Sequence, residues 1–133
     1  MLIERPNCIL KSLYRSAIWR KDSAAKIIYL TFDDGPIPEV TPWVLDVLNN
    51  YGIKATFFCV GDNVRKYPEI LERIKEEGHR VGNHTFNHIA GFQWDCATYM
   101  ENVEEADKLI HSNLFRPPHG HMTRSQYNKL KKK

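Results

Sequence analysis

Four side chains in this sequence have the types and spacings that bind a divalent metal. Asp33 and Asp34 are neighbours in front of a Gly-Pro pair, and His84 and His88 lie four positions apart. Adjacent carboxylates repel each other unless a cation is near, and neutral imidazoles at this spacing suit a metal. One carboxylate with two histidines leaves coordination positions open, so the other carboxylate is free to take a proton from water. The pattern therefore predicts a metal site beside a general base.

Each half of this pattern has a simpler interpretation when it is taken alone. An Asp-Asp-Gly-Pro segment suits a hydrophilic turn, and a pair of histidines often includes one ordinary surface or core residue. The metal hypothesis depends on the two halves lying together in the fold.

A third polar segment reads Phe115-Arg116-Pro117-Pro118-His119-Gly120. Its prolines have no amide hydrogen, which leaves the N–H groups of His119 and Gly120 as candidate oxyanion donors. Arg116 could hold a carboxylate in a bidentate grip and keep it ionised. A structural salt bridge or a phosphate contact would use the same arginine, and both interpretations stay open on the sequence alone.

The elements that must position these residues alternate between strands and helices. We expect strands over 27–32, 55–60, 80–81 and 114–116, with a turn at Gly61-Asp62. We expect one helix from Pro42, capped by Thr41, to a stop at Gly52, and a second from Pro68 to a stop at Gly78. A third helix is expected over 98–111. The last is expected to begin at Thr123 or Ser125 and to run into the terminal lysines. This order is typical of an α/β fold with a parallel sheet, in which chemistry collects at the carboxyl ends of the strands.

The composition describes one ordinary globular domain. The chain has 133 residues, of which 42% are apolar and 26% charged, and its formal net charge is +3. These values argue against a disordered chain, and a chain of this length shows no obvious second domain. Positive charges gather at the end of the chain without any aromatic pattern, so we expect a solvated tail and no nucleic-acid partner. The tail residues are Arg124, Lys129, Lys131, Lys132 and Lys133.

The cysteines and the N-terminus add two negative expectations. Cys8, Cys59 and Cys96 include no C-x-x-C pair, which favours neither a disulfide framework nor a zinc-thiolate site. Cys59 lies in an apolar run and is expected to be a small buried residue. Charges and a proline interrupt the apolar start of the chain, and no run approaches the ~18 apolar residues of a membrane span. We expect no membrane span and, by default, a cytoplasmic protein, with the location left open.

Together, the three polar segments resemble the first three motifs of the polysaccharide deacetylase (NodB-homology) family, carbohydrate esterase family 4. The motifs are Thr31-Phe32-Asp33-Asp34-Gly35-Pro36, His84-Thr85-Phe86-Asn87-His88 and Arg116-Pro117-Pro118-His119-Gly120, in the family's order. The resemblance divides the chain into an irregular segment over 1–25, with Tyr14 and Trp19 as packing anchors, and a partial deacetylase domain over 26–133. It implies the N-terminal part of a distorted, incomplete parallel (β/α) barrel.

The resemblance also implies a role for each residue. Asp33 would be the catalytic base, and Arg116 would orient it. Asp34, His84 and His88 would hold the metal, usually Zn²⁺ and sometimes Co²⁺ or Ni²⁺. The implied reaction removes acetyl groups, chiefly N-acetyl, from a polysaccharide such as chitin oligomers or peptidoglycan.

The sequence departs from the family in two ways. His119 stands where the family commonly has tyrosine, which leaves a backbone N–H role intact and affects only the shape offered to the substrate. The later tryptophan strand motif and the late motif with the general-acid histidine are not found before Lys133. We therefore expect weak or no turnover by this chain alone, and an exposed apolar sheet edge prone to self-association. The alternative function is a non-catalytic relic that binds metal or sugar.

Overall fold

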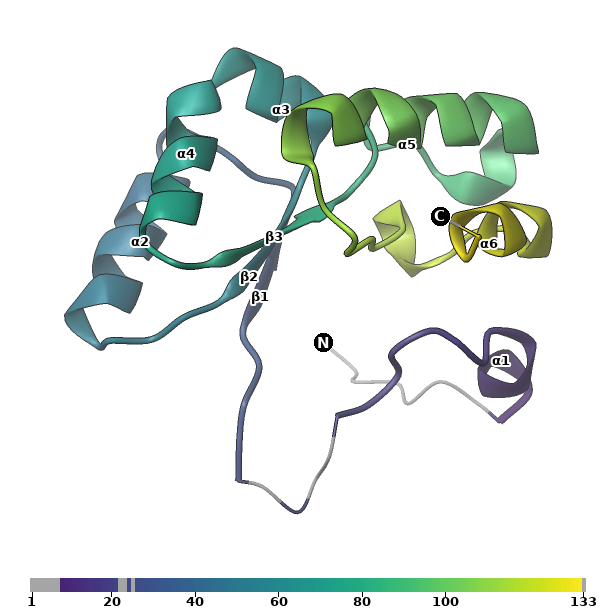
Figure 1. Cartoon of the computed structure of the whole chain (residues 1–133), viewed down its shortest axis with the longest axis horizontal. Helices are drawn as coiled ribbons and strands as arrows, with labels where there is room; N and C mark the ends of the chain where they lie inside the picture. Colours follow the sequence, from purple (N-terminus) through teal and green to yellow (C-terminus); the bar gives the residue numbers. More distant parts are fainter. Residues whose placement is uncertain (1–7, 22–23, 25, 133) are drawn as a thin grey trace.

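A three-stranded parallel sheet forms the centre of the molecule (Figure 1). The computed structural model describes residues 8–21, 24 and 26–132. The sheet contains β1 (Thr31–Asp33), β2 (Thr56–Cys59) and β3 (Arg80–Asn83), in the order β1-β2-β3. Its register places Phe32 opposite Phe57 and Phe57 opposite Val81. The prediction of an α/β fold with a parallel sheet is confirmed.

The expected fourth strand is wrong in extent, because 114–116 forms a single parallel bridge rather than a strand. Phe115 pairs with Asn83. Asn83 N–H donates to Leu114 O at 2.8 Å, and Arg116 N–H donates to Asn83 O at 3.0 Å. A prolyl N–H is missing at the next two positions, so pairing stops after Arg116.

The first strand is also shorter than expected. Residues 27–32 are rich in β-forming side chains, yet pairing begins only at Thr31, opposite Thr56. Ahead of it, the Thr56 N–H donates to Leu30 O at 3.0 Å. Ile28 is 85% exposed and Tyr29 59% exposed, since no neighbouring strand runs beside them among the described residues. Apolar composition predicted the strand, but the length of the partner sets its start.

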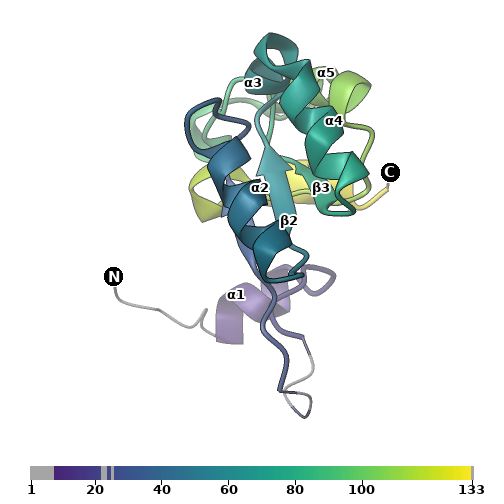
Figure 2. The ribbon, with the colours of Figure 1, turned by 90° about the vertical axis from the view of Figure 1, so that its left-hand side faces the viewer.

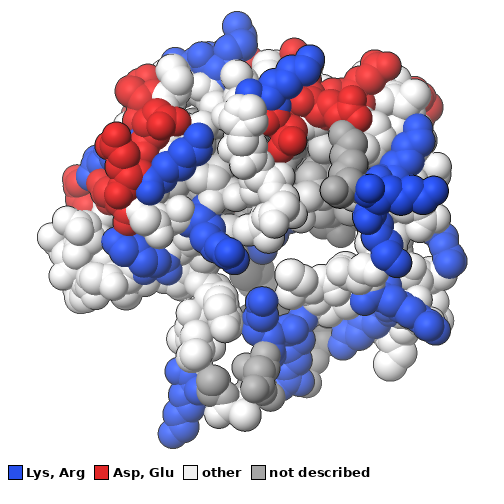
Figure 3. Space-filling view, viewed as in Figure 1, with Lys and Arg blue, Asp and Glu red and all other residues white. Residues whose placement is uncertain are grey.

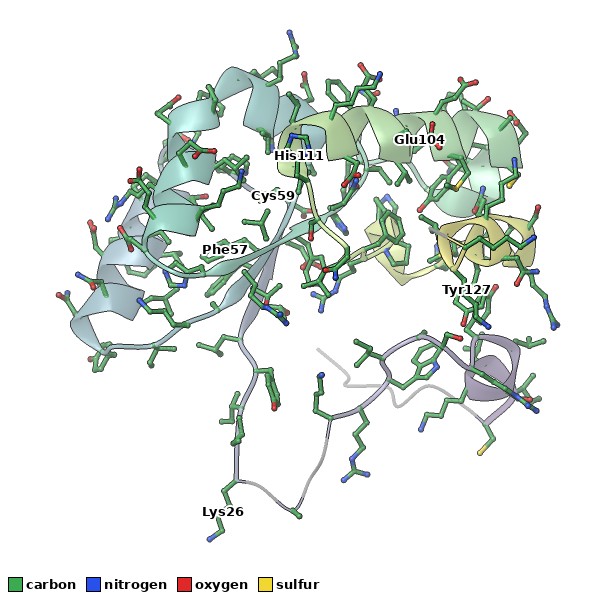
Figure 4. The ribbon with its side chains drawn as sticks, viewed as in Figure 1. Lys26, Phe57, Cys59, Glu104, His111 and Tyr127 are labelled. Carbon is green, nitrogen blue, oxygen red and sulfur yellow. The ribbon has the colours of Figure 1, made fainter. Side chains whose placement is uncertain are left out.

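Two helices, α2 (Thr41–Asn50) and α4 (Pro68–Glu76), lie side by side over one face of the sheet (Figure 2). Their apolar side chains pack on Phe57 and Cys59, which point into this core in Figure 4. Gly52 and Gly78 follow the two helices with φ of +64° and +77°, as the predicted stops require. Thr41 is not the cap of α2 but its first residue, and its hydroxyl accepts from Ile37 N–H at 2.8 Å.

A third helix, α3 (Gly61–Lys66), occupies the segment that we expected to be a turn at Gly61-Asp62. It is too short for a clear apolar period. Gly61 also lowers helix propensity, but it is needed because a Cβ there would lie 2.5 Å from the Phe86 ring and 3.0 Å from Ala106. The packing against these residues decides the conformation.

The last two α-helices of the chain agree with the prediction to within a few residues. Asp95 caps α5 (Cys96–Ile110) through the N–H groups of Ala97 and Thr98. Thr123 caps α6 (Arg124–Leu130) in a capping box with Gln126. Two short 3₁₀ turns, η1 (Gly91–Gln93) and η2 (Pro118–Gly120), precede α5 and α6.

The segment before the sheet is less irregular than expected, because it contains the short helix α1 (Cys8–Leu13). Tyr14 anchors it against α6: its hydroxyl donates to Met122 O at 2.9 Å, and its ring meets Tyr127 edge-on at 4.9 Å. Tyr127 points from α6 toward this segment in Figure 4. Trp19 is 39% exposed, and its Nε1–H donates to the nearby Tyr14 O, so within the described part of the chain it is a weaker anchor than predicted.

Charge is divided between two parts of the surface. Acidic side chains gather over α2, α4 and α5, whereas Lys and Arg dominate around α6 and the segment before the sheet (Figure 3). No Asp or Glu follows Asp107 in the sequence. Across the described residues, no helix has the length and apolar character needed to cross a membrane.

Candidate metal centre

The first and second polar segments meet at the carboxyl ends of β1 and β3. Nε2 of His84 lies 3.3 Å from Asp34 Oδ1, and Nε2 of His88 lies 3.0 Å from the same oxygen. One ligand atom from each of the three residues can be chosen so that all lie within 4.8 Å of one another. Residues 50 or more positions apart in the sequence therefore form one cluster, as the metal hypothesis requires.

The orientation of His84 is fixed by backbone. Its ring Nδ1 lies 2.7 Å from Arg116 O, and a carbonyl can only accept, so Nδ1 carries the hydrogen. The lone pair of Nε2 then faces Asp34. His84 is 3% exposed. Burial, more than any other influence, lowers its pKa and so favours the neutral imidazole that binds metals.

The loop that carries His88 is bent into an unusual conformation. Thr85 and His88 have φ of 64° and 54°. Asn102 on α5 holds this loop: its Oδ1 accepts from Phe86 N–H at 2.9 Å and from Asn87 N–H at 3.0 Å. Its Nδ2 donates to Asn87 Oδ1 at 2.8 Å. These bonds offset the cost of the left-handed residues and place the His88 ring over Asp34.

Asp34 is positioned in the same manner from α3. Its φ is 70°, a conformation that asparagine and aspartate tolerate better than other side chains. Asn63 Nδ2 donates to the Asp34 carbonyl at 2.8 Å. Neither Asn63 nor Asn102 was expected from the sequence, since each resembles an ordinary polar residue on a helix surface.

Asp33 faces Arg116, as the resemblance implied. Arg116 Nη1 lies 2.7 Å from Asp33 Oδ1 and 3.0 Å from Thr31 Oγ1. The guanidinium also lies over the Phe58 ring at 4.1 Å, a cation–π contact. Asp33 and Asp34 thus point to different partners, one to an arginine and the other to two histidines.

The third segment turns back toward the cluster at η2. His119 has φ of 59°, and its ring meets the His88 ring at 4.9 Å. The Gly120 N–H donates to Pro117 O at 3.1 Å, so this donor is already engaged within the turn. The oxyanion role stays a prediction, and of the two predicted donors the N–H of His119 is the better candidate.

The donor set fits a divalent ion of intermediate softness. Two imidazoles and one carboxylate form a set of three candidate ligands. The bond of His84 Nδ1 to Arg116 O and the bond of Asn63 to the Asp34 carbonyl already hold two of these residues in place. The shared approach of both Nε2 atoms to one carboxylate oxygen marks where the charge of a cation would be placed.

Comparison with known proteins shows the family of this chain. The profile of the family described as polysaccharide deacetylase matches residues 20–133. The chain belongs to the polysaccharide deacetylase family. A peptidoglycan-N-acetylglucosamine deacetylase of Bacillus cereus is 36% identical over 118 residues, which cover 85% of this chain and 55% of that protein. A chitooligosaccharide deacetylase of Bradyrhizobium is 43% identical over 90 residues, covering 68% of this chain and 41% of the relative.

Solved structures of the same family superimpose on this polysaccharide deacetylase chain. PdaA of Bacillus subtilis, a family 4 carbohydrate esterase, has a TM-score of 0.81 at 32% identity, covering 95% of this chain and 58% of that one. The peptidoglycan deacetylase PdaC of Bacillus subtilis has a TM-score of 0.78 at 35% identity, covering 84% and 58%. The chain spans about half the length of these relatives. The partial NodB-type fold predicted from the motifs is confirmed.

Proposed function

We propose that this chain holds the metal ligands and the general base of a metal-dependent hydrolase that removes N-acetyl groups from a polysaccharide. The observation that carries the proposal is the convergence of His84 and His88 on Asp34, with Asp33 and Arg116 beside them. The family relationship supports the reaction class. Two of the relatives, a peptidoglycan-N-acetylglucosamine deacetylase and a chitooligosaccharide deacetylase, act on N-acetylated amino sugars.

Asp34, His84 and His88 would hold the ion, with Zn²⁺ as the first choice for this donor set and Co²⁺ or Ni²⁺ as alternatives. When bound, a divalent ion supplies positive charge that polarises the acetyl carbonyl and makes a water molecule more acidic. The Nδ1–H of His84 donates to Arg116 O, so only Nε2 of this imidazole is available to bind the ion.

Asp33 is the residue that accepts the proton from water. Arg116 Nη1 donates to one oxygen of that carboxylate, which leaves the other oxygen to take the proton. The N–H of His119 is the candidate donor to the carbonyl oxygen as negative charge develops on it. The site accounts in this way for a base and an oxyanion donor. We assign no general acid to it and propose that turnover by this chain is slow.

Two measurements on the same variants test the proposal. Bound metal is counted by elemental analysis after loading with Zn²⁺, and acetate release is followed with the N-acetylglucosamine tetramer. We expect one ion per chain in the wild type and in Asp33→Asn, and none in Asp34→Ala. Slow acetate release should be found only in the wild type and in a control variant, Asp46→Asn, which lies on α2.

The outcomes separate the two candidate functions. A folded wild-type chain that takes up no ion would contradict the metal centre. A full complement of Zn²⁺ without any acetate release would favour the alternative of a non-catalytic protein that binds metal or sugar.

A further inference from the structure

A row of ring side chains leads away from the metal centre. It starts at the ligand His88, whose ring meets His119 at 4.9 Å. His119 lies 6.2 Å from His121 at an interplanar angle of 28°. The row ends with Phe92, which stacks on His121 at 4.7 Å and 14°. Catalysis as proposed above uses only the first part of this row, so Phe92 and His121 have no role there.

Phe92 contributes little to the core. Its side chain is 63% exposed, and His119 and His121 are exposed as well. A single exposed aromatic side chain is common on protein surfaces and does not by itself indicate a binding site. Here, however, the exposed ring is stacked on a second exposed ring, and the pair is continuous with the ligand set.

The pair is held in place by a buried amide. Gln126 on α6 is 0% exposed. Its Nε2 donates to Gly91 O at 2.9 Å and to Trp94 O at 3.1 Å, and its Oε1 accepts from Thr123 N–H at 2.8 Å. One side chain therefore ties the two ends of the Phe92 turn to the chain that follows His121.

The backbone of this turn approaches the same segment too closely for any side chain at residue 91. A Cβ on Gly91 would lie 2.8 Å from Met122 Cα and 3.1 Å from His121 O. Phe92 is thus presented from a turn fixed on both sides, and ordering it costs a ligand little conformational entropy.

The chemistry of the pair suits a sugar ring. A pyranose has one or two faces of C–H groups that stack on a flat aromatic surface, and hydroxyl groups at its rim that pair with imidazole nitrogens. Burying the exposed part of the Phe92 ring also removes apolar surface from water.

We propose that Phe92 and His121 form a carbohydrate subsite that stacks on a neighbouring unit of the polymer whose acetyl group lies at the metal centre. The inference rests on the proposed function for its substrate class, and it adds a binding position outside the metal ligands. It also gives η1 and Gln126 a purpose, which is to hold the stacking surface at a fixed place relative to His119.

Binding can be tested without catalysis. Isothermal titration of the metal-free, chelator-treated chain with the N-acetylglucosamine monomer and tetramer gives the gain in affinity on lengthening the ligand. We expect Phe92→Ala and His121→Ala to weaken tetramer binding about three- to tenfold and to reduce that gain. Phe92→Tyr should retain it, because the ring is preserved.

A matched control is Trp43→Ala on α2, where an aromatic side chain is 65% exposed and lies outside the row of rings. Its tetramer affinity should equal that of the wild type. Unchanged tetramer affinity in both Phe92→Ala and His121→Ala, or no tetramer binding by the wild type at millimolar concentration, would overturn the subsite. Thermal unfolding of each variant shows whether the fold is retained.

This experiment is separable from the test of catalysis. A zinc-loaded chain that releases no acetate would contradict the proposed function, while a length-dependent affinity that requires Phe92 would still support the subsite.

Discussion

Arg116 bonds His84 through its backbone and Asp33 through its side chain. The Arg116 carbonyl accepts from His84 Nδ1 at 2.7 Å, and Nη1 of the same residue donates to Asp33 at 2.7 Å. One residue therefore orients both a candidate metal ligand and the candidate base. Because the two contacts use different parts of Arg116, substitution of its side chain can separate them.

Arg116→Met should affect the candidate base Asp33 without affecting metal binding through His84. The variant keeps the backbone carbonyl that orients His84 and removes the guanidinium that holds Asp33. We expect Zn²⁺ affinity within about threefold of the wild type and acetate release lower by about 10²-fold, within the range for losing acid–base assistance. Chelator competition and acetate release on the same preparation measure the two effects. A parallel loss of Zn²⁺ affinity would contradict separate roles for the side chain and the backbone.

Asn102→Ala should weaken metal binding although Asn102 is no ligand. The substitution leaves the Phe86 and Asn87 N–H groups without the side-chain acceptor that holds the His88 loop. Loss of such supporting bonds costs about 10–100-fold in metal affinity. Zinc affinity by chelator competition measures this.

Two further variants make that comparison sharper. Asn102→Asp keeps an acceptor for the two N–H groups and should retain more affinity than Asn102→Ala. Asn128→Ala, an exposed position on α6, should bind Zn²⁺ as the wild type does. Equal affinities for Asn102→Ala and Asn128→Ala would show that the loop holds its shape without Asn102.

His79 should make folding stability depend on pH. Its Nδ1 accepts from Ala55 N–H at 3.1 Å, so the ring must be neutral at that nitrogen. Burial chiefly, and then the charge of Lys54, lowers its pKa from 6.5, against a weaker opposing effect of Glu77. The unfolded chain therefore takes up the proton first as the pH falls. The contribution of His79 to folding stability is therefore complete above about pH 6.5. It is lost as the pH falls from there through the lower pKa of the folded state.

Urea unfolding of the metal-free chain at several pH values between 5 and 8 checks this expectation. His79→Asn offers an acceptor to Ala55 and does not titrate, so its stability should fall less steeply below pH 6.5. Some slope should remain, because burial also lowers the pKa of His84. Identical slopes for the two proteins would exclude His79 as a source.

Cys59 should be unreactive in the folded chain. It is 0% exposed, and burial raises the pKa of its thiol to about 12. Thiolate, the reactive form, is therefore scarce at neutral pH. Iodoacetamide followed by peptide mass analysis should label the exposed Cys8 first and Cys59 only in denaturant. Rapid native labelling of Cys59 would mean that the core around β2 opens readily.

The clustering of the three candidate ligands could be predicted from the sequence because these residues belong to short local motifs at strand ends. Asp34, His84 and His88 come together for the reason that parallel strands order their carboxyl ends along one edge of the sheet. Likewise, the stops at Gly52 and Gly78 follow from the backbone conformation that glycine allows.

The supporting residues could not be predicted in this way, because each acts across the fold. Asn63 and Asn102 bond loops 29 and 15 or more positions away, and nothing in their own helices marks them. The predicted length of the strand over 27–32 was wrong for a related reason. The apolar pattern indicates a tendency to form a strand, whereas pairing requires a neighbouring strand of matching extent. Helix α3 depends on the close packing of Gly61, which is a tertiary contact.

The contact of Tyr14 with α6 has a kinetic consequence. Its hydroxyl bonds Met122 across 108 positions of sequence, whereas most helix and sheet contacts can form within shorter stretches. The entropic cost of closing a loop rises with its length and is paid before the contact returns any energy. We therefore expect residues 8–21 to dock after the sheet and helices have formed, and to be released early when the chain unfolds.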